Sequence, residues 1–299
     1  MCASHSHAQN MRITNALEEF VLQLEANGRS PHTVAQYRRH VAFLAAWLAP
    51  QDDIQRVDHQ TLARFLTSPT VRERRGGGPR KATSANGLRS SLRTFFAWVH
   101  AAGYAPRNAA ALVQRARCGP PLPRTISDDD QERLLAVLGQ AKDPEGLRDR
   151  ALFTTMLRTG IRVGSAVALD VVDLDLGRGE LHLGTTKGDR PARVLVPREV
   201  VELLLGYLSG RTSGPLFPGR RGERITTRHV ARRLKAWLQR AGVEGAASPH
   251  SLRHSFATRL LARTGDLALV QVALNHASVA STTVYARVAP ERLREALGA

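Results

Sequence analysis

Two residues near the carboxy-terminal end have types and a spacing suited to chemistry on a phosphate. His250 and Arg253 stand three residues apart at the start of a predicted helix, so their side chains leave one face of it. Ser248 is a suitable N-cap and Pro249 fits the first turn, so the pair lies beside the positive end of that helix. An imidazole and a guanidinium at such an end favour a phosphate or another anion.

Two more reactive side chains follow within the same stretch. A second helical run begins after Gly265-Asp266 and ends at Asn275-His276, and a third, short run carries Tyr285. This spacing predicts that another imidazole and a phenol come within reach of the first pair. Each residue alone is more typical of ordinary helix packing, but the four together predict an active site.

The first third of the chain predicts a small helical domain. Apolar residues recur at helical spacing over residues 14–27, 30–49, 58–66 and 83–102, and glycine or proline separates these segments. Between the third and fourth segments, residues 72–81 carry three consecutive glycines among five basic residues, which predicts a flexible basic loop. We expect a disordered tail over residues 1–11 and a four-helix domain over residues 12–105.

The rest of the chain predicts a linker and a second domain. Residues 106–125 contain four of the fifteen prolines, which is typical of a linker. Residues 126–299 form the second domain, in which helices surround three predicted strands at 171–176, 180–184 and 192–196. The fold class predicted is mainly α with a small β-meander.

Charge and composition limit the partners. Lys and Arg total 43 against 26 Asp and Glu, which gives a net charge of +17 and favours a polyanion partner. No apolar run approaches the length of a membrane span, and two cysteines form no disulfide framework, so we expect a cytoplasmic protein. The sequence has no CxxC, HExxH, EF-hand or P-loop motif, so we expect no metal and no cofactor.

Several segments resemble one enzyme family. PHSLRHSFATRLL, LNHAS and STTVYARV resemble the carboxy-terminal boxes of the tyrosine recombinases, the phage-integrase and Xer-type family, and TGIRVGSAVAL resembles the box with their first catalytic arginine. SPHTVAQYRRHV and LRSSLRTFFAWVHAAGY are similar to their core-binding domain. The resemblance covers about 285 residues and implies an N-terminal four-helix core-binding domain followed by a C-terminal α+β catalytic domain.

The resemblance also implies a set of catalytic residues, with Tyr285 as the nucleophile. They are Arg162, Lys187 on the β-hairpin, His250, Arg253, His276 and Tyr285. Two positions depart from the family pattern: Asn275 replaces the usual glycine, and Ser165 replaces an acidic residue that would orient the site. Asp170 and Asp173 are both open as replacements for that carboxylate.

Double-stranded DNA target sites are the partner that the resemblance implies. The DNA-binding residues expected in the first domain are Thr33, Arg38, Arg80, Lys81, Thr83 and Arg89, and those expected on the basic face of a later helix are Arg228, Arg232 and Lys235. Recombinases of this kind act as tetramers on two duplexes, so we expect a homotetramer on DNA, with or without a second recombinase.

The expected reaction is breakage and rejoining of DNA strands through a 3′-phosphotyrosyl intermediate, without metal or ATP. Two arginines suit the charge of a pentavalent phosphorus, and a tyrosyl phosphodiester conserves the bond energy for rejoining. Two alternatives stay open. One is an enzyme like the type IB topoisomerases, and the other is a DNA-binding accessory protein whose catalysis is weakened by Ser165 and Asn275.

Overall fold

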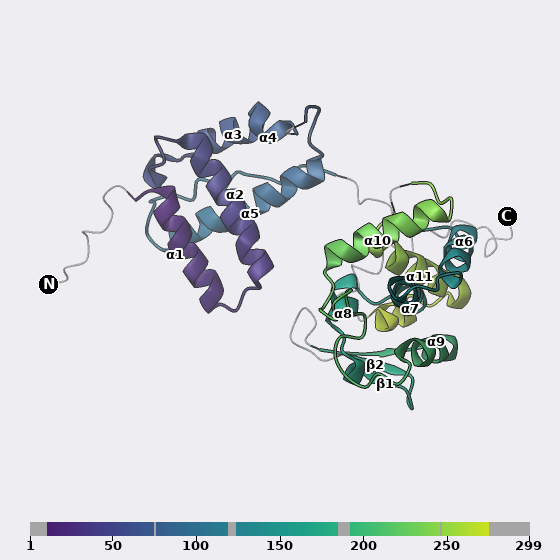
Figure 1. The fold of residues 1–299 in the computed structure, drawn as a ribbon. Helices are drawn as coiled ribbons and strands as arrows, with labels where there is room; N and C mark the ends of the chain where they lie inside the picture. Colours follow the sequence, from purple (N-terminus) through teal and green to yellow (C-terminus); the bar gives the residue numbers. More distant parts are fainter. Residues whose placement is uncertain (1–10, 75, 119–123, 185–191, 246, 275–299) are drawn as a thin grey trace. The chain divides into compact units, whose positions relative to one another are not determined.

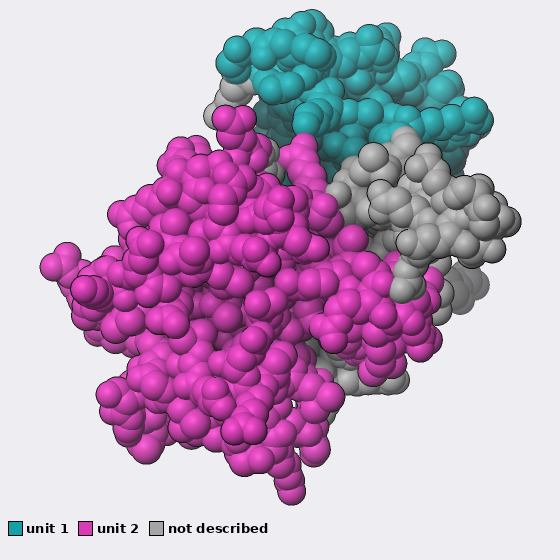
Figure 2. All heavy atoms as spheres, turned by 90° about the vertical axis from the view of Figure 1, so that its right-hand side faces the viewer, with its two compact units in different colours: residues 1–119 teal, residues 120–299 magenta. Residues whose placement is uncertain are grey.

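The chain divides into two compact units, residues 1–119 and 120–299 (Figures 1 and 2). The computed structural model describes residues 11–74, 76–118, 124–184, 192–245 and 247–274. Within these ranges no helix is both long enough and apolar enough to cross a membrane.

Unit 1 is a helical bundle. Its helices are α1 (Ile13–Ala26), α2 (Pro31–Leu48), α3 (His59–Thr67), the one-turn α4 (Pro69–Arg72) and α5 (Ala82–Ala101), with a 3₁₀ turn at Ile54–Arg56 (Figure 1). The four longer helices match the four predicted segments. Two of them begin at side-chain caps, because Ser30 Oγ accepts from the Thr33 amide at 3.3 Å and Asp58 Oδ1 accepts from the Thr61 amide at 2.7 Å.

Aromatic residues fill the core of unit 1. Phe20 of α1 meets Phe95 of α5 edge to face, with ring centroids 5.4 Å apart, and it also contacts Trp98 and Tyr37. The helices α1, α2 and α5 all pack against one another, so these three form the body of the bundle.

The basic segment between α4 and α5, where the sequence predicts a flexible loop, contains a hydrogen-bonded turn. The Arg74 amide donates to the Gly78 carbonyl at 3.0 Å, and the Arg80 amide donates to the Arg72 carbonyl at 2.6 Å. Gly77 and Gly78 have φ values of +83° and +78°, which lets the chain reverse between these two hydrogen bonds. The glycines therefore permit the tight turn that this loop contains.

Part of the predicted linker is attached to α5. Asn86 is 6% exposed; its Nδ2 donates to the Ala116 carbonyl at 3.0 Å and its Oδ1 accepts from the Ala116 amide at 2.7 Å. Ala109 and Ala110 are also buried in the core of unit 1. At the start of unit 2, the Ile126 amide donates to Ser255 Oγ at 2.8 Å. The chain is therefore fixed at Ala116 in one unit and at Ile126 in the other.

Unit 2 is built around one buried helix. Its helices are α6 (Asp128–Gly139), α7 (Pro144–Thr159), α8 (Val163–Ala168), α9 (Arg198–Leu208), α10 (Thr227–Arg240), α11 (Pro249–Thr264) and α12 (Leu267–Ala273). Helix α7 contacts α6, α9 and α11, and its Phe153 and Met156 are fully buried. The end of this helix is consequently a rigid place from which to present a side chain.

A small antiparallel sheet completes unit 2. Its strands β1 (Leu174–Asp175), β2 (Glu180–Leu183) and β3 (Ala192–Leu195) lie in the order β1-β2-β3, with Leu181 opposite both Leu174 and Val194. The predicted first strand, 171–176, is wrong in its first half, because Val171–Asp173 is a 3₁₀ turn. Asp170 and Asp173 cap each other there, and the Asp170 amide donates to Asp173 Oδ2 at 2.8 Å.

Candidate active site

Arg162 is presented by a sharp turn at the end of α7. Gly160 ends that helix in the left-handed region, with φ +66°, and Arg162 follows in an extended conformation as the N-cap of α8. A Cβ atom at Gly160 would lie 2.3 Å from Cδ1 of Phe256 and 3.0 Å from Cδ2 of Leu274. Both the positive φ and the close approach therefore require glycine two residues before the arginine.

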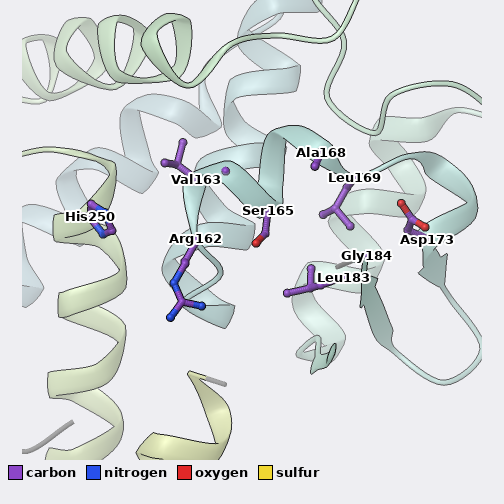
Figure 3. Close-up of a pocket in the computed structure, with 10 residues that line it drawn as sticks. Arg162, Val163, Ser165, Ala168, Leu169, Asp173, Leu183, Gly184 and His250 are labelled. Carbon is purple, nitrogen blue, oxygen red and sulfur yellow. The ribbon is translucent and has the colours of Figure 1, made fainter. Parts of the chain in front are cut away.

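Arg162 and His250 line one hollow, although 87 residues separate them in the sequence (Figure 3). The hollow has a volume of about 470 Å³, and α8, the end of β2 and the first turn of α11 contribute to its walls. Ser165 and Asp173 also line it. The structure thus brings together two of the six residues predicted to be catalytic, from two distant boxes.

The start of α11 is held by the predicted cap. The Ser248 hydroxyl accepts from the third backbone amide of the helix, and the Ser248 amide donates to Ser251 Oγ at 3.1 Å. His250 lies in this first turn and is exposed. One turn further, His254 is half-buried, and burial, followed by the proximity of His250 and Arg253, lowers its pKa. Its ring centroid lies 6.3 Å from that of His250, so a second imidazole stands beside the predicted one, and the sequence analysis did not single it out.

Arg253 is buried and connects two segments of the site. Its side chain donates from Nη1 to the Gly160 carbonyl and from Nη2 to the Leu274 carbonyl, both at 2.6 Å, and the residue is only 5% exposed. Gly160 ends the helix before Arg162, and Leu274 follows α12. One guanidinium consequently fixes the ends of two helices relative to α11.

Lys187, His276 and Tyr285 lie outside the described residues. In the sequence, Lys187 follows Gly184 of the hollow by three residues, and His276 follows Leu274 by two.

The two carboxylates considered as replacements at Ser165 have different surroundings. Asp170 Oδ1 accepts from Nη2 of Arg224 at 2.6 Å, while Nη1 of the same arginine donates to the carbonyls that end α8. Asp173 lines the hollow together with Ser165, and its Oδ2 accepts from the Asp170 amide. Asp173 is thus the carboxylate that lines the hollow, whereas Asp170 binds the arginine that also binds the end of α8.

A buried ionic cluster that the sequence analysis did not identify holds α7 against α10. Asp149 is 1% exposed and accepts from Nη2 of Arg148 at 2.7 Å, from Nε of Arg233 at 2.5 Å and from Nε1 of Trp237 at 2.8 Å. An Arg-Asp pair within a helix usually indicates a solvated face, so only the partner residues on α10 reveal its burial. The cluster fixes the helix that presents Arg162.

The DNA-binding residues predicted in unit 1 lie on two packed helices and in the turn that precedes the second of them. Thr33 and Arg38 lie on α2, Arg80 and Lys81 directly precede α5, and Thr83 and Arg89 lie on α5. The two helices are joined by a 2.8 Å hydrogen bond between His40 Nδ1 and Ser91 Oγ. Arg38 is exposed and pairs with Glu18 at 2.5 Å, which raises the pKa of the arginine, so this guanidinium already has a carboxylate partner.

The basic face of α10 is exposed as predicted. Arg228, Arg232 and Lys235 are exposed, whereas Val230 and Leu234 on the other side of the helix are buried. Among the described residues, no carboxylate forms an ion pair with these three cations. This face of α10 is therefore available to an anionic partner.

Comparisons with known proteins identify the family along both units. Residues 124–292 match the family described as the Phage integrase family, and residues 17–103 match the Phage integrase, N-terminal SAM-like domain. Tyrosine recombinase XerD of Ralstonia nicotianae is 32% identical over 295 residues, which cover 94% of this chain and 92% of the relative. Tyrosine recombinase XerC of Salmonella typhi is 36% identical over 262 residues, which cover 86% of this chain and 85% of the relative.

Solved structures share the fold. The XerH site-specific recombinase bound to a palindromic difH substrate aligns with a TM-score of 0.73 and 21% identity, over 95% of this chain and 84% of that one. A lambda integrase tetramer bound to a Holliday junction aligns with a TM-score of 0.73 and 18% identity, over 93% of this chain and 78% of that one. The predicted fold class is confirmed, and the chain belongs to the phage integrase family of tyrosine recombinases.

Proposed function

We propose that this chain is a site-specific recombinase that cuts and rejoins DNA strands through a 3′-phosphotyrosyl intermediate on Tyr285. The observation that supports this most directly is the hollow that Arg162 and His250 both line. Arg253 lies one turn after His250 and is held by backbone carbonyls on both sides. The curated relatives described above are named tyrosine recombinases, and the family match over residues 124–292 includes the positions of all six residues predicted to be catalytic.

The cations of this site suit the charge of the transition state. Attack on a phosphodiester produces a pentavalent phosphorus whose non-bridging oxygens carry the developing negative charge. In our proposal, Arg162 and Arg253 each donate to these oxygens, because a guanidinium presents paired N–H groups to a phosphate. His276 hydrogen-bonds one of the same oxygens.

The remaining residues move protons and form the covalent bond. The phenolic oxygen of Tyr285 forms a bond to phosphorus while the bond from phosphorus to the 5′ oxygen breaks. His250 accepts the phenolic proton, and Lys187 donates a proton to the leaving 5′ oxygen. The new ester has nearly the energy of the old one, so a 5′ hydroxyl can reverse the reaction on a new strand.

We propose double-stranded DNA as the partner and a tetramer as the assembly that acts. Support comes from the net charge of +17 and from the exposed basic face of α10. The XerH and lambda integrase structures contain DNA, and one lambda integrase structure is a tetramer bound to a Holliday junction. We place the reaction in the cytoplasm, with this chain alone or with a second recombinase in the tetramer.

The proposal is tested by trapping the covalent intermediate. The purified protein is incubated with a labelled duplex containing its site, and a denaturing gel reveals any protein–DNA adduct. Tyr285→Phe should bind the duplex but form no adduct, because a phenyl ring has no oxygen to attack phosphorus. Tyr207→Phe is the matched control, since Tyr207 is the other tyrosine of residues 126–299 and stacks on Phe217 with centroids 6.2 Å apart.

Each alternative function predicts a different result in these assays. A protein that binds the duplex but forms no adduct is the weakened accessory protein, an idea favoured by Ser165 in the hollow. A monomer that forms the adduct and relaxes supercoiled plasmid without preference for a site is a type IB-like topoisomerase. An adduct on Tyr207 would show that the nucleophile is misassigned.

A further inference from the structure

A second hollow, of about 550 Å³, lies within unit 1 between α5 and residues 108–115. Helix α5 contributes Ser90, Arg93 and Thr94, and the segment after it contributes Asn108 and Arg115. None of these five residues belongs to the set that the sequence predicted to bind DNA.

The second wall of this hollow is held in place at both ends. At one end, Asn108 Oδ1 accepts from the amide of Ala110, a residue that is 1% exposed. At the other end, the buried Asn86 forms two hydrogen bonds with the backbone of Ala116. Because Arg115 directly precedes Ala116, its backbone has a defined position beside α5.

The charge of the hollow is not balanced by acidic groups. No carboxylate lines it, and in the part of the chain that the structure describes neither Arg93 nor Arg115 forms an ion pair. Among the described residues of unit 1, Arg38 pairs with Glu18 and Arg56 with Asp53, whereas Arg64 on α3 forms no ion pair, so it is the presence of two unpaired guanidiniums in one hollow that distinguishes this site. Two unpaired guanidiniums in one hollow repel each other, and an anion bound there would remove that repulsion.

The uncharged groups of the hollow also suit an anion. The oxygen of the Asn108 amide is occupied by the Ala110 amide, which fixes which end of the side chain is the donor. The Thr94 hydroxyl donates to the Ser90 carbonyl at 3.1 Å. The Ser90 hydroxyl and the Asn108 amide nitrogen therefore add neutral donors to the two guanidiniums, which is the donor set of a phosphate site.

We propose that this hollow binds a backbone phosphate of duplex DNA. Arg93 and Arg115 are both exposed, so they can reach a phosphate of a polymer whose neighbouring phosphates are bound elsewhere on a chain of net charge +17. A free phosphate ion has no neighbouring phosphates bound elsewhere on the chain, so these exposed donors alone would have to bind it. The assignment rests on the proposed function, since it takes the duplex to be the substrate.

The test measures duplex affinity at several salt concentrations for Arg93→Ala, Arg115→Ala and the double variant. Losing a phosphate contact should reduce the magnitude of the log–log salt slope by about 1 and weaken binding about tenfold for each arginine. The weakening should be equal for duplexes with and without the target site, because a phosphate contact carries no base sequence. Arg93→Lys should keep the slope, since it keeps the charge.

The matched control is Arg64→Ala. Arg64 is an exposed arginine of α3 and, among the described residues, forms no ion pair, so its substitution removes the same charge from another surface of unit 1. A slope reduction equal to that of Arg93→Ala would mean that net charge alone is responsible and would overturn the proposal. An unchanged slope in the double variant would also overturn it.

Two further measurements are needed. The first distinguishes a DNA contact from a site for free anions, and the second distinguishes failure of the phosphate site from failure of the proposed function. If inorganic phosphate raises the Tm of the unmodified protein but not that of the double variant, the hollow is a free-anion site and the assignment to DNA is wrong. Adduct formation at Tyr285 by the unmodified protein tests the proposed function independently. An adduct together with an unchanged salt slope rejects only the phosphate site, whereas no adduct rejects the proposed function itself.

Discussion

Substituting Gly160 by alanine should damage both stability and catalysis, for two reasons that can be separated. The first is backbone strain, because φ at Gly160 is +66° and the left-handed region costs an alanine about 1–2 kcal/mol. The second is overlap, because the new Cβ would lie 2.3 Å from the Phe256 ring, and overpacking of this kind costs about 1–3 kcal/mol. We therefore expect the free energy of unfolding to fall by about 2–5 kcal/mol.

The matched control for strain alone is Gly210→Ala. Gly210 has φ +85°, and a Cβ there would meet no atom within 4 Å, so only the term of about 1–2 kcal/mol applies. Urea denaturation followed by circular dichroism gives both values. The difference between the two variants is the cost of the contact with Phe256, which a double-mutant cycle with Phe256→Ala measures directly.

The catalytic effect of Gly160→Ala follows from its neighbours. The Gly160 carbonyl accepts from Arg253, and Arg162 lies two residues further along, so backbone movement that relieves the overlap displaces both arginines. A misplacement of about 1 Å can cost roughly 10²-fold in rate. Single-turnover adduct formation should therefore slow strongly in Gly160→Ala and remain unchanged in Gly210→Ala. Equal stabilities and equal rates for the two variants would refute this reasoning.

Four further outcomes are expected. Duplex affinity should fall with salt at a log–log slope of about −5 or steeper, corresponding to at least six neutralised phosphates, and a flat response would argue against any extended DNA contact. Asp149→Asn should lower the free energy of unfolding by about 3–5 kcal/mol in urea denaturation, since it leaves the buried Arg148 without its counter-charge. A change below about 1 kcal/mol would contradict the stabilising role of the buried ionic cluster between α7 and α10. Lys187→Ala should cleave an ordinary duplex roughly 10²–10⁴-fold more slowly yet cleave a 5′-thio substrate almost normally, because a thiolate leaves without an acid, and absence of that rescue would remove Lys187 as the proton donor. Burial lowers the pKa of His254 in the folded state, so the unfolded state binds more protons below about pH 6.5, and the free energy of unfolding should fall as the pH drops through that value. His254→Gln should reduce this pH dependence, and an unchanged pH profile in the variant would show that His254 does not contribute.

The sequence predicted the long helices well because their signals are local. Ser248 caps α11 as expected, Ser30 caps α2 in the same way, and proline occupies the first turn in both cases. It failed at Val171–Asp173, where an apolar run typical of a strand is bent into a 3₁₀ turn by the mutual capping of Asp170 and Asp173. It also gave no indication of the hydrogen-bonded turn before α5, because three glycines are compatible with either flexibility or a tight reversal.

The long-range features of the site have no local signal. No spacing rule connects Arg162 with His250, and their common hollow was expected only because of the family resemblance. The burial of Asp149 depends on Arg233 and Trp237, which lie more than 80 residues later. The attachment of Ala116 to Asn86 could not be predicted from the sequence either, because an asparagine within a helix usually faces solvent.

This attachment shortens the tether between the two units. Between the fixed residues Ala116 and Ile126 only residues 117–125 connect the units, instead of the whole predicted linker 106–125. At the maximal extension of a polypeptide, the ten steps from Ala116 to Ile126 span about 35 Å, which corresponds to about ten base pairs of duplex. Once one unit has bound DNA, the attachment point of the other unit stays within that distance, so the effective concentration of the second unit near the same duplex is high. The greatest distance between the two attachment points is therefore set in part by a side-chain amide on α5.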